Sequence, residues 1–201
     1  EQHDRDDERV DVAHPAVAEL VLVVGLALGP LASHEQQHLV AGVGRVASRI
    51  GISADDPAFE GPYFQSAYAE AHVAAARRLH DAGLAYYCDL TSEQIQERSK
   101  TNGKQGYDGY SRDRGLEAGP GRVLRFRVPE GQTVVHDLVR GRVEFANETI
   151  EDFVLLRGNG SPMFLLANVV DDVTMRVSHV VRAEEHLPNT PKQQMIWDAL
   201  G

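Results

Sequence analysis

The stretch VVRAEEHLPNTPKQ, from Val180 to Gln193, runs from an apolar segment through one arginine and two glutamates into a helix start. The segment VSHVV, residues 177–181, has the β-branched composition of a buried strand. Thr190 and Gln193 have capping-box spacing and Pro191 suits the first helical position, so a helix is expected here. A strand, a charged loop and a capped helix indicate an α/β fold, in which ligands bind beyond the carboxyl ends of the strands.

Arg182 directly follows the expected strand. A buried strand would present its guanidinium at the sheet edge, where the planar group can bind a carboxylate through two charge-assisted hydrogen bonds. Glu184 and Glu185 would then lie beside it. A second interpretation is an Arg–Glu ion pair at a strand end together with one solvated acid. The residue types of this segment leave both interpretations open.

Length and composition limit the class of protein. A chain of 201 residues can bury one core or two small ones, and 42% hydrophobic with 25% charged residues is typical of globular domains. The net charge of -10 excludes a polybasic nucleic-acid binder but permits a local basic groove. Cys88 is the single cysteine, so it forms no internal disulfide and predicts a reducing compartment, the cytoplasm.

The first fifty residues differ in composition from the rest. They contain no Lys, Phe, Tyr, Trp, Met, Cys, Asn or Thr, and all eight types occur later. One interpretation is an Ala/Val-rich helical lead, and the other is a non-native segment such as an out-of-frame translation of GC-rich DNA. The apolar run Val17–Ala32 is short for a membrane span and follows an acidic leader, so we expect neither a membrane segment nor a targeting signal.

HEQQH, residues 34–38, matches the zinc-protease pattern, in which two histidines one helical turn apart bind zinc and the glutamate activates water. Gly29 and Pro30 leave little room for a helix before it, and Ala41 stands where the longer motif has glycine. A zinc metalloprotease is therefore a minor alternative.

Two helices are expected beyond residue 51. Ser66 as N-cap of an alanine-rich run predicts a helix over residues 67–82, ended by a glycine. Thr91 and Gln94 have capping-box spacing and predict a second helix that ends near Asn102. A glycine-rich loop follows.

Three segments with partial alternation of apolar residues follow this loop: VLRFRVP, TVVHDLV and RVEFAN, within residues 123–147. Turn residues separate them, so they predict a small antiparallel meander. A Gly-Asn-Gly-Ser turn is expected at residues 158–161, and His179 in the VSHVV segment is expected to pack in the core.

LANVVDD (166–172), taken with VVRAEEHLPNTPKQ, closely resembles the second half of the catalytic domain of bacterial glutamyl-tRNA synthetases. GPYFQS, GYDGYSRDRG, FRVPEG, DLVRGRVEF and LLRGNGSPMFLLAN match the same family in order, so the resemblance covers about residues 51–201. The related glutamyl-queuosine tRNA synthetases usually have Arg-Gly-Ala-Asp-Leu and a zinc cysteine set. This chain has RAEEHL and Cys88 alone, so we expect no structural zinc.

The resemblance implies an α/β fold, specifically a partial Rossmann-type class I synthetase catalytic domain with an inserted α+β subdomain that binds the tRNA acceptor stem. Residues 1–50 are then an unassigned lead, and 51–85 end the first half of the catalytic domain. Residues 86–160 form the inserted subdomain, and 161–201 begin the second half.

The resemblance also implies the site residues. Arg182 would bind the substrate glutamate, Asn168 would lie in the amino-acid pocket, and Glu185 would lie at the ATP site. Phe164 stands where the family usually has tyrosine and lacks its hydroxyl group.

The function implied is glutamate–tRNA ligation: ATP, expected with Mg²⁺, activates L-glutamate to glutamyl-adenylate, and the glutamyl group passes to the 3′ end of tRNA(Glu). No protein nucleophile is expected, and catalysis consists of positioning and stabilisation of phosphate charge. The chain contains neither ATP motif of class I enzymes, of the His-Ile-Gly-His and Lys-Met-Ser-Lys-Ser types, so alone it is expected to be inactive. A cytoplasmic monomer is expected, with a degenerate, non-catalytic tRNA-binding module as the alternative.

Two sets of charged residues each have a structural and a functional interpretation. Asp171 and Asp172 could be a metal pair, but capping or structural hydrogen bonding is favoured. Four arginines could contact tRNA phosphates: Arg112, Arg122, Arg125 and Arg127. Arg125 and Arg127 are two apart on an expected strand, which favours a solvated face for that pair.

Overall fold

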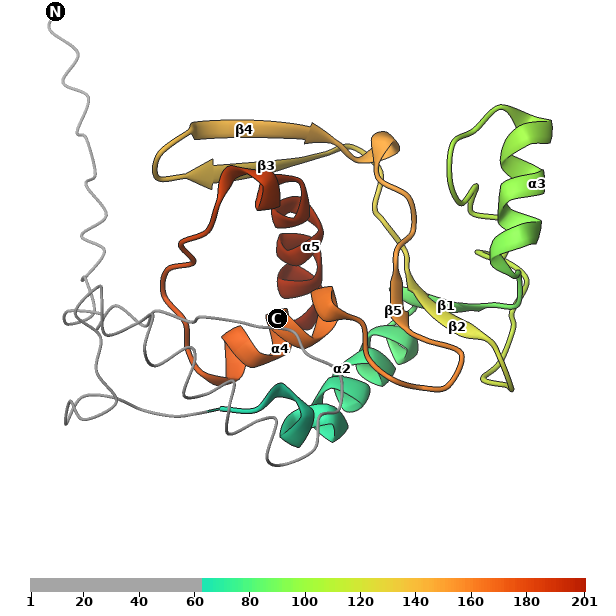
Figure 1. Ribbon diagram of the computed structural model, residues 1–201, viewed down its shortest axis with the longest axis horizontal. Coiled ribbons are helices and arrows are strands. Elements are labelled where there is room, and N and C mark those ends of the chain that lie inside the picture. Colours follow the sequence, from blue (N-terminus) through green and yellow to red (C-terminus); the bar gives the residue numbers. More distant parts are fainter. Residues whose placement is uncertain (1–62) are drawn as a thin grey trace, which may run out of the picture.

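The computed structural model describes residues 63–201 (Figure 1). The elements in chain order are η1 (Gln65–Tyr68), α2 (Ala69–Asp81), β1 (Ala85–Cys88), α3 (Ser92–Asn102), β2 (Val123–Phe126), β3 (Gln132–Asp137), β4 (Gly141–Ala146), η2 (Asn147–Thr149), β5 (Val154–Leu156), α4 (Phe164–Thr174), η3 (Glu184–Asn189) and α5 (Thr190–Leu200). HEQQH and the first fifty residues lie outside the described part. Among the described helices, none is long and apolar enough to cross a membrane.

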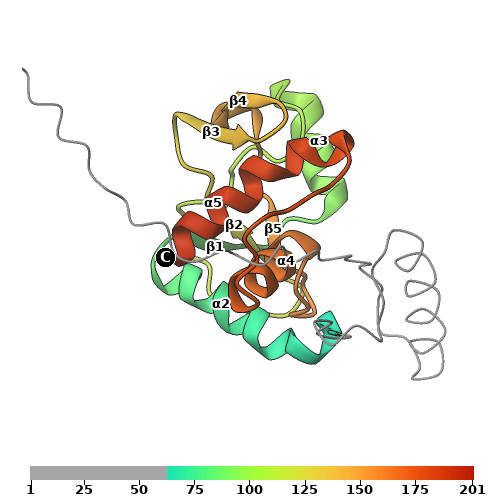
Figure 2. The same ribbon diagram turned by 90° about the vertical axis from the view of Figure 1, so that its left-hand side faces the viewer.

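The core lies between three helices and one sheet. Helices α2, α4 and α5 contact one another, and α2 also contacts β1 and β5. The most deeply buried large side chains come from each layer: Leu79, Leu124, Leu155, Leu166 and Ile196. In both ribbon views the β3–β4 hairpin and α2 lie at opposite ends, with α5 between them (Figures 1 and 2).

Helix α2 confirms the helix expected over residues 67–82. Its buried residues recur at helical spacing, His72, Ala75, Ala76 and Leu79, so one stripe faces the core. Gly83 takes the left-handed conformation, with φ of 73°, which allows the helix to end. The expected N-cap, Ser66, is wrong, because it lies inside the 3₁₀ turn η1 and η1 has no side-chain cap.

Helix α3 confirms the second expected helix, including its start. The Thr91 hydroxyl accepts a hydrogen bond from the Gln94 amide, and the Gln94 side chain accepts one from the Thr91 amide. Gly103, with φ of 71°, ends the helix after Asn102. Local side-chain chemistry was enough to define this helix because neither cap depends on distant residues.

The expected three-stranded meander is wrong in its pairing. β3 and β4 do form an antiparallel hairpin, but β2 lies in a separate sheet of order β1-β2-β5. Three successive residues of β2 are buried, Leu124, Arg125 and Phe126, whereas burial in β3 is intermittent. A strand that is buried on both faces needs hydrogen-bonded neighbours on both edges, and β1 and β5 provide them.

The expected strand over residues 177–181 is also wrong. The segment is irregular, Val180 and Val181 are 59% and 71% exposed, and His179 is exposed rather than packed in the core. β-branched composition favours extended backbone, but a strand needs a partner for its amide and carbonyl groups. None of the strands in residues 63–201 pairs with this segment.

A buried carboxylate, Asp152, joins the loop before β2 to the three-stranded sheet. Asp152 is 3% exposed and accepts hydrogen bonds from Arg112 Nε at 2.6 Å, Arg112 Nη2 at 2.5 Å and the Val128 amide at 2.9 Å, together with the Tyr86 hydroxyl. Arg125 donates to the Asp152 carbonyl at 2.6 Å. Arg112 and Arg125 therefore have structural partners, and Arg125 is buried, which contradicts its expected place on a solvated face.

Burial alone would raise the pKa of Asp152, but the hydrogen bonds from Arg112, Tyr86 and the Val128 amide lower this pKa below its ordinary value. The stability supplied by these contacts is present above the ordinary carboxyl pKa and is lost as the pH falls through the lowered value. Burial and the Asp152 hydrogen bond raise the pKa of Tyr86, so the phenol stays protonated and donates.

Asp152→Asn is expected to lower the free energy of unfolding by roughly 2–4 kcal/mol, because it leaves the Arg112 cation without its carboxylate. The value is below that of a fully buried pair because the Arg112 side chain is 33% exposed. Urea denaturation at neutral pH measures the change. Asp113→Asn, which removes an exposed carboxylate 3.3 Å from Arg127, is the control and should have little effect. Equal losses in the two variants would contradict the assignment.

Candidate functional site

Helix α4 carries one polar face and one buried face. Leu166, Val169 and Val170 are buried against the core. Phe164 and Asn168 are one turn apart on the other face, where Phe164 is 40% exposed, and Asp171 and Asp172 follow on the next turn. The residues that the sequence analysis assigned to the amino-acid pocket therefore lie on one face of one helix, α4.

The polar face of α4 is bound to the segment that opens α2. Gln65 Nε2 donates to Asp171 Oδ2 at 2.9 Å and to Asn168 Oδ1 at 3.2 Å. His72 Nε2 lies 2.6 Å from Asp171 Oδ1 and completes the contacts of this carboxylate. The structural hydrogen-bonding role expected for Asp171 is confirmed. No group of three His, Cys, Asp or Glu side chains that could hold a metal ion occurs in residues 63–201.

Arg182 is held by the first turn of α5. Its Nη1 donates to Gln193 Oε1 at 2.6 Å and its Nη2 donates to Thr190 Oγ1 at 2.6 Å. The expected capping box is therefore wrong: Asn189 precedes α5, and no side-chain cap forms. A guanidinium is a stronger donor than a backbone amide, so the two capping side chains turn toward Arg182.

Asp172 and Arg182 interact across the site. Burial raises the pKa of Asp172 to about 6, the nearby charge of Asp171 acts in the same direction, and Arg182 opposes both. Burial lowers the pKa of Arg182, and Asp172 opposes that shift. Because each group affects the other, the polar face of α4 and the Arg182 segment share one electrostatic environment, despite their separation in the chain.

The two glutamates after Arg182 have different surroundings. Glu184 forms an ion pair with Arg140, in the turn between β3 and β4, rather than with Arg182, the pairing that the second interpretation of this segment offered. Glu185 is exposed in η3. Gln194 Nε2 also donates to the Val134 carbonyl of β3 at 3.2 Å. The hairpin is thus attached to η3 and α5, and it lies beside the first turn of α5 (Figure 1).

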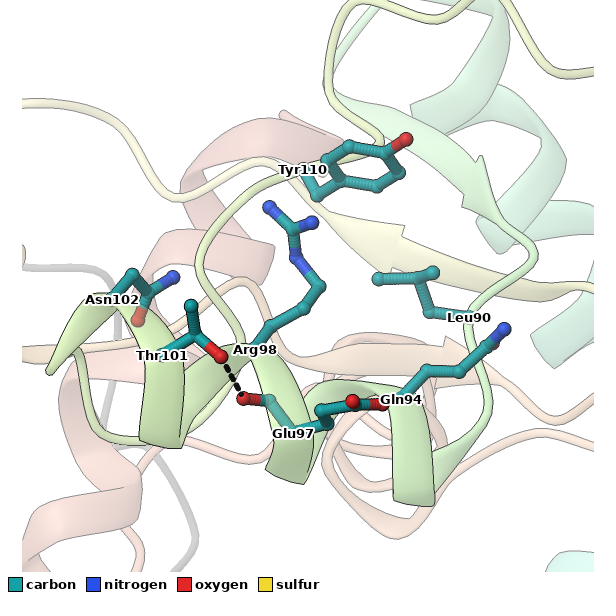
Figure 3. Close-up of a pocket in the computed structure, with 7 residues that line it drawn as sticks. All are labelled: Leu90, Gln94, Glu97, Arg98, Thr101, Asn102 and Tyr110. Atoms are coloured by element: carbon teal, nitrogen blue, oxygen red, sulfur yellow. Dashed lines mark hydrogen bonds between the residues drawn. The ribbon is translucent and has the colours of Figure 1, made fainter.

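Two surface hollows lie elsewhere, within residues 90–152. One, of about 400 Å³, is formed by α3 and Tyr110, and Figure 3 shows Arg98 pointing toward the tyrosine ring. The Arg98 guanidinium is 3.9 Å from the ring centroid and pairs with Asp108 at 2.7 Å. The second, of about 570 Å³, lies beside Asp152. Neither hollow contains Arg182, Asn168, Phe164 or Glu185.

The residues that support Arg182 and Asn168 are not evident from the sequence alone. Gln65 is one residue of the GPYFQS motif, and His72 lies within the alanine-rich helix. Thr190 and Gln193 were assigned to a helix cap. A polar residue on the core face of an amphipathic helix was the available signal for His72, because a buried imidazole needs a partner.

Comparison with known proteins identifies the family. Residues 33–201 match the family described as tRNA synthetases class I (E and Q), catalytic domain. The chain belongs to this family. The match begins inside the unassigned lead and includes the HEQQH segment.

Two relatives of this chain carry the same name, glutamate–tRNA ligase. The chain is 62% identical over 171 residues to the glutamate–tRNA ligase of Thermobifida fusca, and the match covers 85% of this chain and 36% of that ligase. It is 63% identical over 153 residues to the glutamate–tRNA ligase of Salinispora tropica, covering 76% and 32%. The chain therefore spans about a third of the length of these relatives.

A solved structure confirms the fold of the synthetase domain. The glutamate–tRNA ligase of Elizabethkingia meningosepticum, in complex with its amino acid, superposes with a TM-score of 0.66 at 24% identity. The match covers 85% of this chain and 38% of that one. The expected fold class, a partial Rossmann-type class I catalytic domain, is confirmed.

Asp172→Asn should make stability less dependent on pH. Because the folded-state pKa of about 6 is above that of an exposed carboxyl, the folded chain holds this proton more tightly than the unfolded chain does. The stabilisation that this tighter proton binding supplies is present at about pH 4 and is lost as the pH rises through about 6. Thermal unfolding followed by circular dichroism between about pH 4 and 7 should show a smaller decline in the variant.

The matched control for this measurement is Asp81→Asn, which removes an 80% exposed carboxylate at the end of α2. It should keep the pH profile of the unaltered chain. A profile of Asp172→Asn identical to that of the control would mean that Asp172 titrates as an exposed carboxyl group.

Proposed function

We propose that this chain is part of a glutamate–tRNA ligase and contributes the portion of the catalytic domain that binds glutamate. The observation that carries the proposal is the Arg182 guanidinium, held by Thr190 and Gln193 at 2.6 Å each and electrostatically linked to α4. The names of the relatives support the same reaction.

Arg182 would bind a carboxylate of glutamate. A guanidinium has five N–H donors, and the two contacts to α5 use one hydrogen on each terminal nitrogen. The remaining donors can form the bidentate pair that a carboxylate accepts. Partial burial strengthens such a pair, because the lower local dielectric reduces screening.

Asn168 and Phe164 would line the amino-acid pocket from α4. The side-chain amide of Asn168 can form hydrogen bonds with the charged ends of the substrate. Phe164, 40% exposed one turn earlier, would contact the aliphatic part of glutamate without the hydroxyl contact that tyrosine would make. Glutamate would thus be held by one cation, one amide and one aromatic ring.

Glu185 would lie on the nucleotide side of the site, since it is exposed in η3 three residues after Arg182. A carboxylate oxygen of glutamate would attack the α-phosphorus of ATP, and pyrophosphate would leave as the acyl–phosphate bond forms. A ribose hydroxyl at the 3′ end of tRNA would then attack the acyl carbon and release AMP. Mg²⁺ would neutralise the phosphates of ATP, and no protein side chain forms a covalent bond.

The tRNA acceptor stem would bind residues 86–160, which include α3 and the β3–β4 hairpin. The Arg140–Glu184 pair connects this region to the segment that carries Arg182 and Glu185. The match of residues 33–201 to the synthetase family extends over HEQQH and favours a synthetase role for that segment over a zinc protease. A cytoplasmic monomer remains part of the proposal.

Arg182→Lys should weaken glutamate binding by about tenfold or more, because an ammonium group cannot reproduce the planar bidentate contact. Isothermal titration of the purified chain with L-glutamate measures the dissociation constant. Arg77→Lys is the matched control, since Arg77 is exposed on α2, and it should bind like the unaltered chain. Equal affinities for all three proteins would contradict the role of Arg182, and tRNA binding without glutamate binding would favour the non-catalytic module.

ATP–pyrophosphate exchange tests whether the chain suffices for activation. The purified 201-residue chain should exchange little or no pyrophosphate, because the two phosphate-binding motifs of class I enzymes do not occur in its sequence. Glutamate-dependent exchange above background would contradict this expectation.

A further inference from the structure

The hydrogen bonds beneath Asn168 have a defined direction. Asp171 lies at their centre and accepts from His72 on one oxygen and from Gln65 on the other. Gln65 then donates to Asn168 Oδ1. His72, 1% exposed, and Asp171 both lie on helices of the core, so the network rests on rigid elements.

The chemistry of these groups leaves one consistent orientation for each amide. A carboxylate only accepts hydrogen bonds, so Gln65 must present its NH₂ group to Asp171 rather than its carbonyl oxygen. An NH₂ group has two hydrogens, and the second is directed at Asn168, whose oxygen must face it. For the same reason His72 must carry its proton on Nε2.

We infer that Gln65, Asp171 and His72 are positioning residues that fix the side-chain amide of Asn168 with its NH₂ group directed away from the network, as a hydrogen-bond donor to a carboxylate of the amino-acid substrate. The inference rests on the proposed function, in which Asn168 lines the glutamate pocket. Among the described residues, the network uses Asn168 Oδ1 and no partner occupies its Nδ2.

The orientation of the Asn168 side-chain amide matters because its NH₂ group carries a partial positive charge and its oxygen a partial negative charge. An NH₂ group attracts a carboxylate, whereas a carbonyl oxygen in the same place repels it. The two orientations differ by a rotation about one side-chain bond, and an isolated asparagine can adopt either. The network removes that freedom before the substrate binds and selects for an anionic ligand.

Hydrogen exchange of the side-chain amides, followed by NMR on the unaltered chain, tests the orientation without any ligand. The Gln65 NH₂ protons should exchange slowly, because both are hydrogen-bonded, and the Asn168 NH₂ protons should exchange at a rate set by solvent access. Slow exchange at Asn168 with fast exchange at Gln65 would overturn the inference.

Gln65→Glu combined with Asp171→Asn tests the consequence for binding. In this double variant the new amide at position 171 donates to the new carboxylate at position 65. That carboxylate then accepts from the Asn168 NH₂ group and turns the Asn168 oxygen toward the substrate. The number of charges and the hydrogen bonds of the network are kept, so the thermal midpoint should stay close to that of the unaltered chain. The dissociation constant for glutamate should rise by about tenfold or more.

A double variant that folds and binds glutamate within about twofold of the unaltered chain would overturn the inference. Should the double variant fail to fold, the exchange measurement on the unaltered chain still decides the amide orientation. Failure of the unaltered chain to bind glutamate would instead refute the proposed function, and the exchange measurement would remain valid, so the two failures are distinguishable.

Discussion

The position of α4 is the constraint on which the candidate site depends. Its apolar residues, including Leu166 and Val169, close the core between α2 and α5, and this packing determines which way the opposite face points. The opposite face carries Phe164, Asn168 and the two aspartates. A change that rotated α4 would therefore disturb core packing and the site together. The rigidity of the core keeps the site residues at fixed positions relative to one another.

Three charged side chains among the described residues, Asp152, Asp171 and Arg182, are each held by more than one partner rather than by a single contact. Asp152 receives donors from three segments, Asp171 from two, and Arg182 has two acceptors on α5. Such sets stabilise one orientation of each group, since a buried polar atom without a partner is costly. The same principle applies around Asp152 and around the α4 residues of the candidate site.

The differences between expectation and structure have a common origin. Thr190 and Gln193 have the spacing of a helix cap, but Arg182 competes for both side chains. Arg125 and Arg127 are two apart, as on one solvated face of a strand, yet Leu124, Arg125 and Phe126 are all buried and the Arg125 guanidinium lies 3.9 Å from the Tyr107 ring centroid. Residues 177–181 have strand composition without a strand partner in the described part of the chain. In each case the local residues are compatible with more than one structure. The presence or absence of a partner elsewhere in the chain determines which structure forms.

By itself, the sequence determined α2, α3 and α5, the local cap of α3, the β3–β4 hairpin and the family, because short-range spacing and ordered motifs carry that information. It also indicated Arg182 and Asn168 through resemblance, but it did not indicate α4. Only the tertiary structure decided which strands pair, which arginines are buried, and how Gln65, His72 and Asp171 meet Asn168. The physical reason is that hydrogen-bond partners 99 to 106 residues apart in the chain are set by packing of the whole domain.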